Sequence, residues 1–510
     1  MKQFAFLMIG IITGLLSSCG EGNVPGSEEI HFSQEQNWTG EPAGWVYHNG
    51  KYHLFYQCNP SDVVSGNISW GHAVSTDLIR WEECPVAIAA DENGQIYSGS
   101  VIVDKDNTSG LGSADRPVFI AYYTRYKPEQ GTDSNSSPYS VGTVYSRDEG
   151  MTWTDITMEW EDGSDNKRYP NVCWNKQIDA WVMTVSTGRT IRFYFSPDAI
   201  HWKSLNEFGG EMEITGSWEN STLSPLKIEG SDDTKWVLFI NVNEGVSDGA
   251  PGTRYFIGDF NNSGFHMTQS KELWVDYGKD NYGGILCNNL SDDRTIMVGW
   301  MNCWLYANLT PQTGKRGSIT FPRELTLAYE GNNYTLCSKP VHELTGLYGK
   351  TRKIENTEIA GIQTVFNKKS VSRYPFVIHL VFDASDRYAM WHPREYGIRL
   401  RTASGGEITF AYRAEMNYYY VDRSRLSGTS FSEDYTSRLG AAYRVNPPAD
   451  EWYLLVDRGS AEWFAGDNKV AMTSLCFTDE AIESIDCYTE SGHINLKEAS
   501  LISIEKKTNK

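Results

Sequence analysis

A weak internal repeat constrains the fold of this 510-residue chain more than any other feature. A serine, an aspartate two residues later and then a tryptophan recur behind hydrophobic stretches, at spacings of 50 to 71 residues. The three copies are Ser75/Asp77/Trp81, Ser146/Asp148/Trp153 and Ser196/Asp198/Trp202. The blades of a β-propeller produce such a recurrence of one strand-turn-strand unit. We interpret the aspartates as turn caps rather than catalysts, because Asp side chains readily bond to nearby backbone N–H groups.

The rest of the chain from Asn37 onward is also typical of strands. Short aromatic or β-branched stretches alternate with clusters of Gly, Asn, Asp and Ser, for example at 44–47, 52–56, 118–123, 181–185 and 236–240. The repeat fades after Leu327, and later strands such as 376–380 and 452–456 alternate like those of a two-sheet sandwich. We therefore predict an all-β chain with a propeller at 31–340, a connector at 341–355 and a β-sandwich at 356–506.

The N-terminal residues have the pattern of an export signal. Lys2 precedes an apolar stretch, 4–16, that is too short to cross a bilayer as a permanent helix. The following Leu-Ser-Ser-Cys resembles the lipobox of bacterial lipoproteins, which implies a signal peptide at 1–18, acylation of Cys19 and a tether at 19–30. We therefore expect an exported protein, lipid-anchored to the bacterial cell envelope on the periplasmic or surface face of the outer membrane.

Composition excludes several classes of partner. The formal net charge of −20 repels nucleic acid and anionic membrane surfaces, so we expect membrane contact through the lipid alone. The ten histidines show no H-E-x-x-H spacing and the cysteines no C-x-x-C spacing, so the sequence predicts neither a metal site nor a cofactor. The 17 Trp and 29 Tyr suit packed strands and also stacking on carbohydrate rings.

Several segments spread along the chain share the motifs of one enzyme family. They read H-N-G-K-Y-H-L-F-Y-Q-C-N-P at 48–60, W-G-H-A-V-S-T-D-L at 70–78, Y-S-G-S at 97–100, G-W-M-N at 299–302 and P-R-E-L-T-L at 322–327, with D-R pairs at 422–423 and 457–458. In these motifs the chain resembles glycoside hydrolase family 32. The resemblance implies a five-bladed β-propeller followed by a β-sandwich. It also implies retaining hydrolysis of β-fructosides such as levan, inulin or sucrose, with fructan or a fructo-oligosaccharide as partner.

The positions that match the catalytic motifs of this family are partly changed. Retaining glycosidases need two carboxyl groups about 5 Å apart, one as nucleophile and one as general acid and then base. The family's nucleophilic aspartate becomes Glu41 in W-T-G-E-P-A-G, and the acid/base is Glu219 in W-E-N. The family's R-D-P is R-Y-P here, so Tyr169 replaces a carboxylate that binds fructosyl hydroxyls.

Other positions of the expected sugar pocket keep residue types of the family. The resemblance implies a sugar-sized cavity at the propeller axis, lined by the substrate-binding residues Trp38, Gln57, Tyr97, Ser98, Arg168 and Tyr169. By residue type alone, the aromatic side chains could equally belong to a core, and the polar ones could satisfy backbone groups. The motif context favours the pocket.

The longer side chain of Glu41 moves its carboxylate by about 1.5 Å, whereas catalytic groups need placement within about 0.5 Å. Gly40, and Ser65 in place of a family tryptophan, could open the space that reseats Glu41. Three hypotheses follow. The first is a retaining β-fructosidase with Glu41 as nucleophile and Glu219 as acid/base. The second is a catalytically impaired surface lipoprotein that binds fructan. The third uses Tyr169 as nucleophile with Glu41 or Glu219 as its base, as in sialidases.

Overall fold

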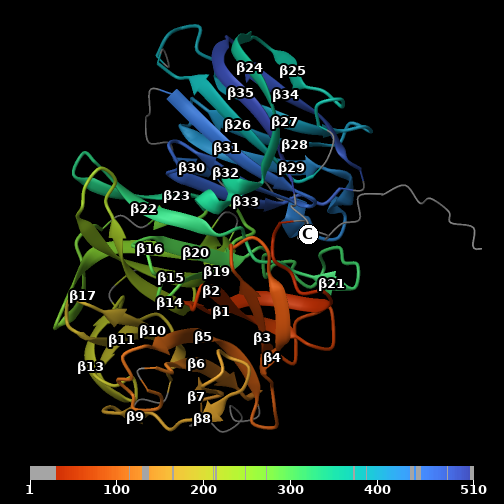
Figure 1. Ribbon diagram of the computed structural model, residues 1–510. Helices are drawn as coiled ribbons and strands as arrows, with labels where there is room; N and C mark the ends of the chain where they lie inside the picture. Colours follow the sequence, from red (N-terminus) through yellow and green to blue (C-terminus); the bar gives the residue numbers. More distant parts are fainter. Residues whose placement is uncertain are drawn as a thin grey trace, which may run out of the picture.

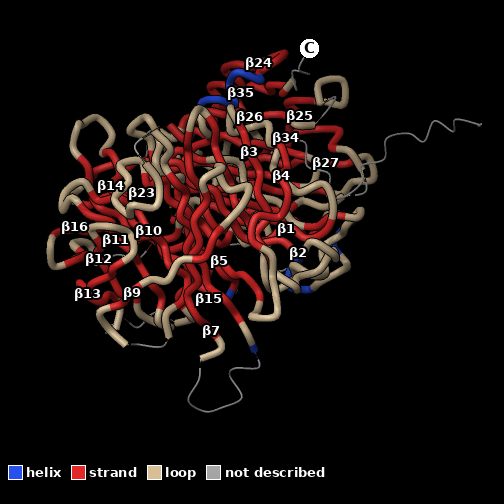
Figure 2. The backbone as a smooth tube through the Cα atoms, turned by 60° about the horizontal axis from the view of Figure 1, so that its bottom comes forward, coloured by secondary structure: helices blue, strands red, loops and turns tan. Residues whose placement is uncertain are grey.

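The computed structural model consists almost entirely of strands and loops (Figures 1 and 2). It describes residues 30–505 apart from 114, 129–136, 164–165, 211, 213–214, 247–248, 271–272, 372–373, 386–387, 437–440, 444–448 and 479. Cys19 and the predicted signal peptide lie outside the described residues, so the lipid anchor stays a prediction. In the described part of the chain, no helix is both long and apolar enough to cross a membrane.

Five separate sheets form the first domain. The first holds β1 (Asn37–His48), β2 (Lys51–Asn59), β3 (Ser69–Ser75), β4 (Glu82–Ile88) and the short β21 (Lys315–Arg316). The second holds β5 (Gln95–Asp104), β6 (Val118–Tyr126), β7 (Tyr139–Ser146) and β8 (Thr154–Asp155). The third holds β10 (Arg168–Asn175), β11 (Ala180–Ser186), β12 (Ile191–Ser196), β13 (His201–Phe208) and β9 (Glu159–Trp160). The fourth holds β14 (Trp218–Lys227), β15 (Thr234–Val246), β16 (Ala250–Asn261), β17 (Gly264–Met267) and β18 (Leu273–Trp274). The fifth holds β19 (Tyr282–Leu286), β20 (Thr295–Trp300), β22 (Arg323–Glu330) and β23 (Asn333–Pro340).

One strand of each sheet lies on the inside of a closed ring. β1 contacts β5, β5 contacts β10, β10 contacts β14, β14 contacts β19, and β19 contacts β1. β21, which follows β20, pairs in parallel with β1 and so ties the end of the ring to its beginning. In Figure 1 the orange-red β1 and the green β19 lie side by side for this reason. The predicted five-bladed propeller is confirmed.

The aspartates of the repeat cap turns, as the sequence predicts. Asp77 Oδ1 accepts hydrogen bonds from the backbone N–H groups of residues 79 and 80, at 3.0 and 2.8 Å. Asp198 makes the same two bonds to residues 200 and 201. Asp148 accepts from the N–H of Thr152 at 2.8 Å. The repeat therefore marks turns between blade strands and not catalytic groups.

The second domain is a sandwich of two six-stranded sheets, coloured cyan to blue in Figure 1. One sheet holds β24 (Tyr348–Ile359), β35 (Ile494–Ile504), β26 (Phe376–Asp383), β31 (Ala449–Asp457), β32 (Ser460–Ala465) and β33 (Val470–Leu475). The other holds β25 (Ile362–Phe366), β34 (Ile482–Glu490), β27 (Glu395–Thr402), β28 (Glu407–Arg413), β29 (Tyr418–Arg425) and β30 (Ala441–Tyr443). Two short helices, η4 (Ser427–Thr429) and α1 (Glu433–Thr436), follow β29. Trp452 and Trp463, with ring centroids 4.7 Å apart, lie in the core between the sheets.

The junction between the domains is more ordered than the sequence predicts. A short helix, η3 (His342–Leu347), leads directly into β24, so much of the expected connector 341–355 is the first strand of the sandwich. β24 pairs only with β35 and lies at the edge of its sheet, where exposed Lys353 and Glu355 are tolerated. Charged side chains are common on edge strands, and because of them the sequence of β24 resembles that of a polar linker.

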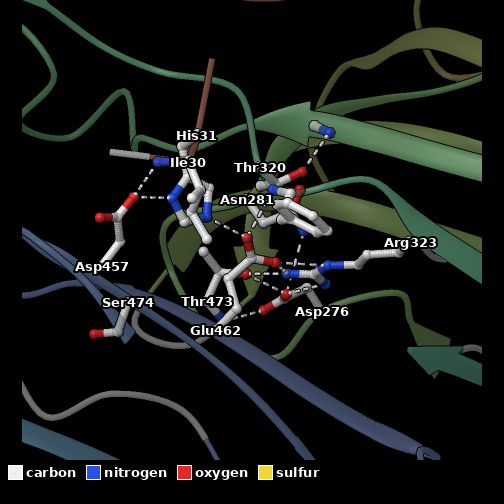
Figure 3. Close-up of polar contacts among 12 residues, drawn as sticks. Ile30, His31, Asp276, Asn281, Thr320, Arg323, Asp457, Glu462, Thr473 and Ser474 are labelled. Atoms are coloured by element: carbon white, nitrogen blue, oxygen red, sulfur yellow. Dashed lines mark hydrogen bonds and ion pairs between the residues drawn. The ribbon is translucent and has the colours of Figure 1, made fainter. Parts of the chain in front are cut away.

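A buried network of charges joins the propeller to the sandwich (Figure 3). Arg323 of β22 donates to Asp276 at 2.7 Å and, through Nε, to Glu462 of β32 at 2.9 Å. His31 bridges Asp457 and Glu462, at 2.8 Å each. Burial opposes a charge on His31, but the hydrogen bonds and charges of the two carboxylates outweigh it and raise its pKa to about 10. The domains are thus held together by buried ion pairs.

A second buried pair belongs to the same interface between the domains. Arg423 of β29 donates to Asp280, which precedes β19, at 2.5 Å. Asp280 also accepts from the hydroxyl of Tyr306 and from the N–H of Leu475. The two D-R pairs singled out in the sequence therefore contribute Arg423 and Asp457 to the domain interface.

Candidate active site

Every inner strand of the ring departs from regular pairing, β1 at two adjacent points between 39 and 44 and each of the others at one. The register shifts lie between 39 and 44 in β1, 97 and 99 in β5, 168 and 171 in β10, 219 and 221 in β14, and 282 and 285 in β19. A β-bulge redirects the side chains beside it. The predicted site residues of four strands lie at these shifts: Glu41, Ser98, Tyr169 and Glu219. The bulges therefore gather residues from distant parts of the chain.

Glu41 is held on both carboxylate oxygens. Its Oε1 accepts from Trp304 Nε1 at 2.8 Å. Its Oε2 accepts from Gln57 Nε2 at 3.3 Å and from the Ser98 hydroxyl at 3.5 Å. Gln57 also donates to Ser98 at 2.5 Å, so these two residues form one unit beneath the carboxylate. The side chain is 7% exposed, and its position is fixed by donors from three strands or turns.

Glu219 lies within electrostatic reach of Glu41. Burial and then the charge of Glu219 raise the pKa of Glu41 to about 8, although the bonds from Trp304, Ser98 and Gln57 lower it. Burial also raises the pKa of Glu219, and the hydrogen bond from Tyr282 and the charge of Arg168 only partly offset this effect. The Tyr282 hydroxyl donates to Glu219 at 2.5 Å. The two buried carboxyls repel each other when both are ionised, so a proton on one favours ionisation of the other.

Tyr169 and Arg168 form the wall contributed by β10. The Tyr169 side chain is buried, and its backbone adopts the left-handed conformation, with φ of 54°. Its N–H donates to Thr124 Oγ1 at 2.6 Å. Burial and the charges of Glu219 and Glu41 raise the pKa of its phenol, which disfavours a phenolate nucleophile. Arg168 lies over the ring of Tyr139 at 4.9 Å, and in the described chain its Nε has no hydrogen-bond partner.

The two predicted aromatic wall residues, Trp38 and Tyr97, are packed in different ways. Trp38 is fully buried, with its ring centroid 5.4 Å from that of Trp300 and 6.0 Å from that of Trp304. Tyr97 is half-buried and stacks on Tyr126, with a centroid distance of 5.1 Å. Burial, together with neighbouring groups that include Glu41 and Glu219, raises the pKa of the Tyr97 phenol. Trp38 therefore packs on Trp304, which holds Glu41, and the Tyr97 phenol senses the charges of both carboxyls.

Three residues of the site were not singled out from the sequence. Trp304 follows the G-W-M-N motif, Tyr282 begins β19, and Gly283 lies in the bulge of that strand. The motif at 299–302 was the signal that could have led to Trp304. Tyr282 has the residue type of a core aromatic, and Gly283 that of a turn. Only the closed ring brings them to Glu219 and Glu41.

The contacts of Gly40 and Ser65, the two positions expected to make room for Glu41, lie with other residues. A Cβ added to Gly40 would lie 3.1 Å from Trp38 Nε1 and 3.2 Å from Gln57 Cβ, so Gly40 faces these residues. Ser65 lies in the loop between β2 and β3, where its N–H donates to Asn308 Oδ1 at 2.9 Å. The space beside Glu41 has another origin, at Gly283.

Comparison with known proteins identifies the architecture. Residues 31–340 match the glycosyl hydrolases family 32 N-terminal domain, and residues 343–504 match the family 32 C-terminal domain. The chain belongs to glycoside hydrolase family 32. This family 32 protein is 32% identical over 489 residues to a levanase of Bacillus subtilis (strain 168), covering 94% of the chain and 70% of the relative. It is 30% identical over 483 residues to an extracellular exo-inulinase of Aspergillus awamori, covering 88% and 89%.

Solved structures of family 32 enzymes have the same fold. The crystal structure of exo-inulinase from Aspergillus awamori superimposes with a TM-score of 0.83 at 28% identity, over 94% of this chain and 99% of that one. A fructofuranosidase from Schwanniomyces occidentalis complexed with fructose gives a TM-score of 0.82 at 25% identity, over 94% and 98%. The predicted family and its propeller-and-sandwich fold are confirmed.

Proposed function

We propose that this family 32 protein is an active retaining β-fructosidase, with Glu41 as nucleophile and Glu219 as acid/base. One observation carries the proposal: neighbouring residues of β19 contact the two carboxyls, because Tyr282 donates to Glu219 and Gly283 lies against the side chain of Glu41. The charge of Glu219 also raises the pKa of Glu41. The levanase, inulinase and fructofuranosidase relatives support levan, inulin, fructo-oligosaccharides or sucrose as substrates.

The hydrogen bonds around the pair support these two roles. Trp304 Nε1 can only donate, and Gln57 presents its Nε2 donor, so both stabilise the ionised form of Glu41 against the burial that raises its pKa. In the reactive form of the proposed enzyme Glu41 is ionised and Glu219 carries a proton, so Glu219 protonates the leaving oxygen while Glu41 attacks the anomeric carbon. Once the covalent fructosyl-enzyme has formed, Glu219 accepts a proton from water, and hydrolysis with retention is completed.

Tyr169 makes the proposed enzyme slower than one with a carboxylate at that position. A hydrogen bond to a charged group contributes about 1.5–3 kcal/mol, more than the neutral bond that a phenol offers. A neutral bond contributes about 0.5–1.5 kcal/mol, so the difference is about 1–1.5 kcal/mol. If it applies in full to the transition state, the rate falls by roughly 5- to 10-fold. Arg168, with free donor capacity at Nε, still offers hydrogen bonds to sugar hydroxyls.

A turnover experiment tests the proposal. The purified chain is incubated with levan, inulin and sucrose, and released fructose is measured for wild type and Glu219→Gln. We expect release by wild type and a loss of at least about 100-fold in the variant. A mechanism-based fluorosugar should label Glu41. Heat of binding in calorimetry without any fructose release would instead favour a fructan-binding protein without turnover.

Export accompanies this function. The exo-inulinase relative from Aspergillus awamori is extracellular by name, and the N-terminal export pattern agrees with that location. Anchoring through Cys19 would keep the enzyme at the cell envelope, near polymeric substrates. Labelling of cells with radioactive palmitate, with Cys19→Ser as control, tests this part of the proposal; an unlabelled wild-type protein would contradict it.

A further inference from the structure

Glu41 is one methylene longer than an aspartate, so its Cγ lies between the backbone and a carboxylate that is held further out. Glu41 lies in the bulge of β1, and its carboxylate ends on donors from Trp304, Gln57 and Ser98. Because both oxygens are held, the carboxylate and the backbone are both fixed. The carbons between them must therefore follow one path through the site.

That path runs past Gly283 of β19. A Cβ added to Gly283 would lie 2.9 Å from Glu41 Cγ, 3.0 Å from its Cβ and 3.5 Å from its Cδ. Carbon atoms in contact lie about 3.5–4.0 Å apart, so the added carbon would overlap the middle of the side chain. Cγ lies between the two fixed ends, and it cannot move away without carrying the carboxylate with it.

We propose that Gly283 is a positioning residue for Glu41. The missing side chain at position 283 leaves the space through which the longer carboxylate reaches Trp304, Gln57 and Ser98. This inference rests on the proposed function, in which Glu41 is the nucleophile. It explains how a glutamate occupies the position of a shorter residue: the room is taken from the facing strand and not from the neighbouring Gly40.

An experiment can distinguish a glycine required for its backbone conformation from a glycine required for the space it leaves beside Glu41. Gly283 has φ of +67°, a region that L-residues rarely adopt. Gly110, in an exposed turn of the propeller, has φ of +70° and nothing within 4 Å of an added Cβ. Gly110→Ala therefore carries the same backbone cost without meeting a side chain, and it is the matched control for Gly283→Ala.

The kinetic test compares four variants: Gly283→Ala, Gly110→Ala, Glu41→Asp and the double variant Glu41→Asp/Gly283→Ala. The overlap requires Glu41 to move by about 0.5–1 Å, and a 1 Å error can cost about 100-fold. We expect kcat for Gly283→Ala to fall by about 10- to 100-fold with KM nearly unchanged, and Gly110→Ala to stay within about twofold of wild type. Both should lower Tm through the same backbone strain, and Gly283→Ala should lower it further because of the overlap with Glu41.

The double variant Glu41→Asp/Gly283→Ala tests whether the glycine at position 283 matters because of the glutamate at position 41. An aspartate keeps the Cβ and a Cγ, its carboxyl carbon, but its shorter side chain is not held at the far end by Trp304, Gln57 and Ser98. It can therefore turn about χ1 and move its Cγ away from residue 283. We expect Gly283→Ala to cost at least fivefold less in the Glu41→Asp background than in wild type. Equal costs in the two backgrounds, or equal losses in Gly283→Ala and Gly110→Ala, would overturn the inference. If Gly283→Ala does not fold, Gly283→Asn takes its place, because asparagine tolerates the left-handed region.

Crystal structures of wild type and Gly283→Ala give a readout that needs no turnover. We expect the Glu41 carboxylate to leave Trp304 Nε1 in the variant. An unmoved carboxylate would refute the positioning role even if the enzyme is active. Conversely, the carboxylate could move in Gly283→Ala while the wild-type protein hydrolyses no fructan. That result would refute the proposed function and leave the positioning role of Gly283 intact.

Discussion

Replacing Trp304 with phenylalanine should raise the pKa of Glu41 and move the acidic limb of the pH–rate profile to higher pH. Trp304 Nε1 donates to Glu41 at 2.8 Å, and this bond lowers the pKa of a carboxyl that burial holds at about 8. Phenylalanine keeps an aromatic ring beside Trp38 and Trp300 but has no donor.

The size of the shift follows from the bond and its exposure. A hydrogen bond to a charged group contributes about 1.5–3 kcal/mol, and about 1.4 kcal/mol corresponds to one pKa unit. The Trp304 side chain is 41% exposed, so water replaces part of the lost donor, and we expect a shift of about one unit. Because Glu41 attacks only when ionised, kcat/KM on the acidic limb should fall about tenfold.

The assay is kcat/KM for fructose release across the acidic and basic range, for wild type, Trp304→Phe and Trp391→Phe. Trp391 is a half-exposed tryptophan of the sandwich and controls for the loss of an indole. We expect the control profile to superimpose on that of wild type. A Trp304→Phe profile with an unmoved acidic limb, or the same shift in both variants, would show that the indole does not hold the Glu41 carboxylate.

The remaining predictions concern stability and Tyr169. Arg323→Met should lower the free energy of unfolding by about 3–5 kcal/mol in urea titrations, because it leaves Asp276 and Glu462 buried without their partner; a loss below about 1 kcal/mol, as expected for an exposed ion pair, would contradict this. His31 has an ordinary pKa of 6.5 and a folded pKa of about 10, so its stabilisation is complete below pH 6.5 and disappears as the pH rises through 10. His31→Gln should therefore destabilise most below pH 6.5, and a difference in unfolding free energy that does not change with pH would argue against a charged His31. Tyr169→Asp should raise kcat by roughly 5- to 10-fold, since aspartate supplies a charged acceptor and tolerates positive φ. Its Tm should fall, because the variant loses a buried aromatic ring and places a third acid beside Glu41 and Glu219; unchanged kcat would show that the phenol costs nothing.

Short-range patterns in the sequence predicted the architecture well. Asp77, Asp148 and Asp198 cap turns within four residues of themselves, so their role is visible in local spacing. The propeller, the sandwich and the family followed from such local signals and from motifs. The start of the sandwich was harder to place, because β24 is an edge strand whose exposed charges resemble a linker.

The site was predictable only where a motif contains the residue. Glu41, Gln57, Ser98 and Glu219 stand in recognisable segments, and the structure brings all four together. Trp304 and Gly283, by contrast, meet Glu41 across more than 240 residues of chain. Closure of the ring creates these contacts, and no local pattern reports them. For the same reason the room for Glu41 was sought at Gly40, its neighbour in sequence.

The buried ion pairs between the domains have a consequence for catalysis. Asp276 and Asp280 lie just before Tyr282 and Gly283, and Tyr306 lies two residues after Trp304. The stretches that carry a partner of each proposed catalytic carboxyl are therefore fixed to the other domain. A propeller expressed alone, ending at residue 340, should lose the anchorage of this wall and the sandwich residues Val377, Leu455 and Ile504 of its core, and its activity should decline at milder conditions than its fold.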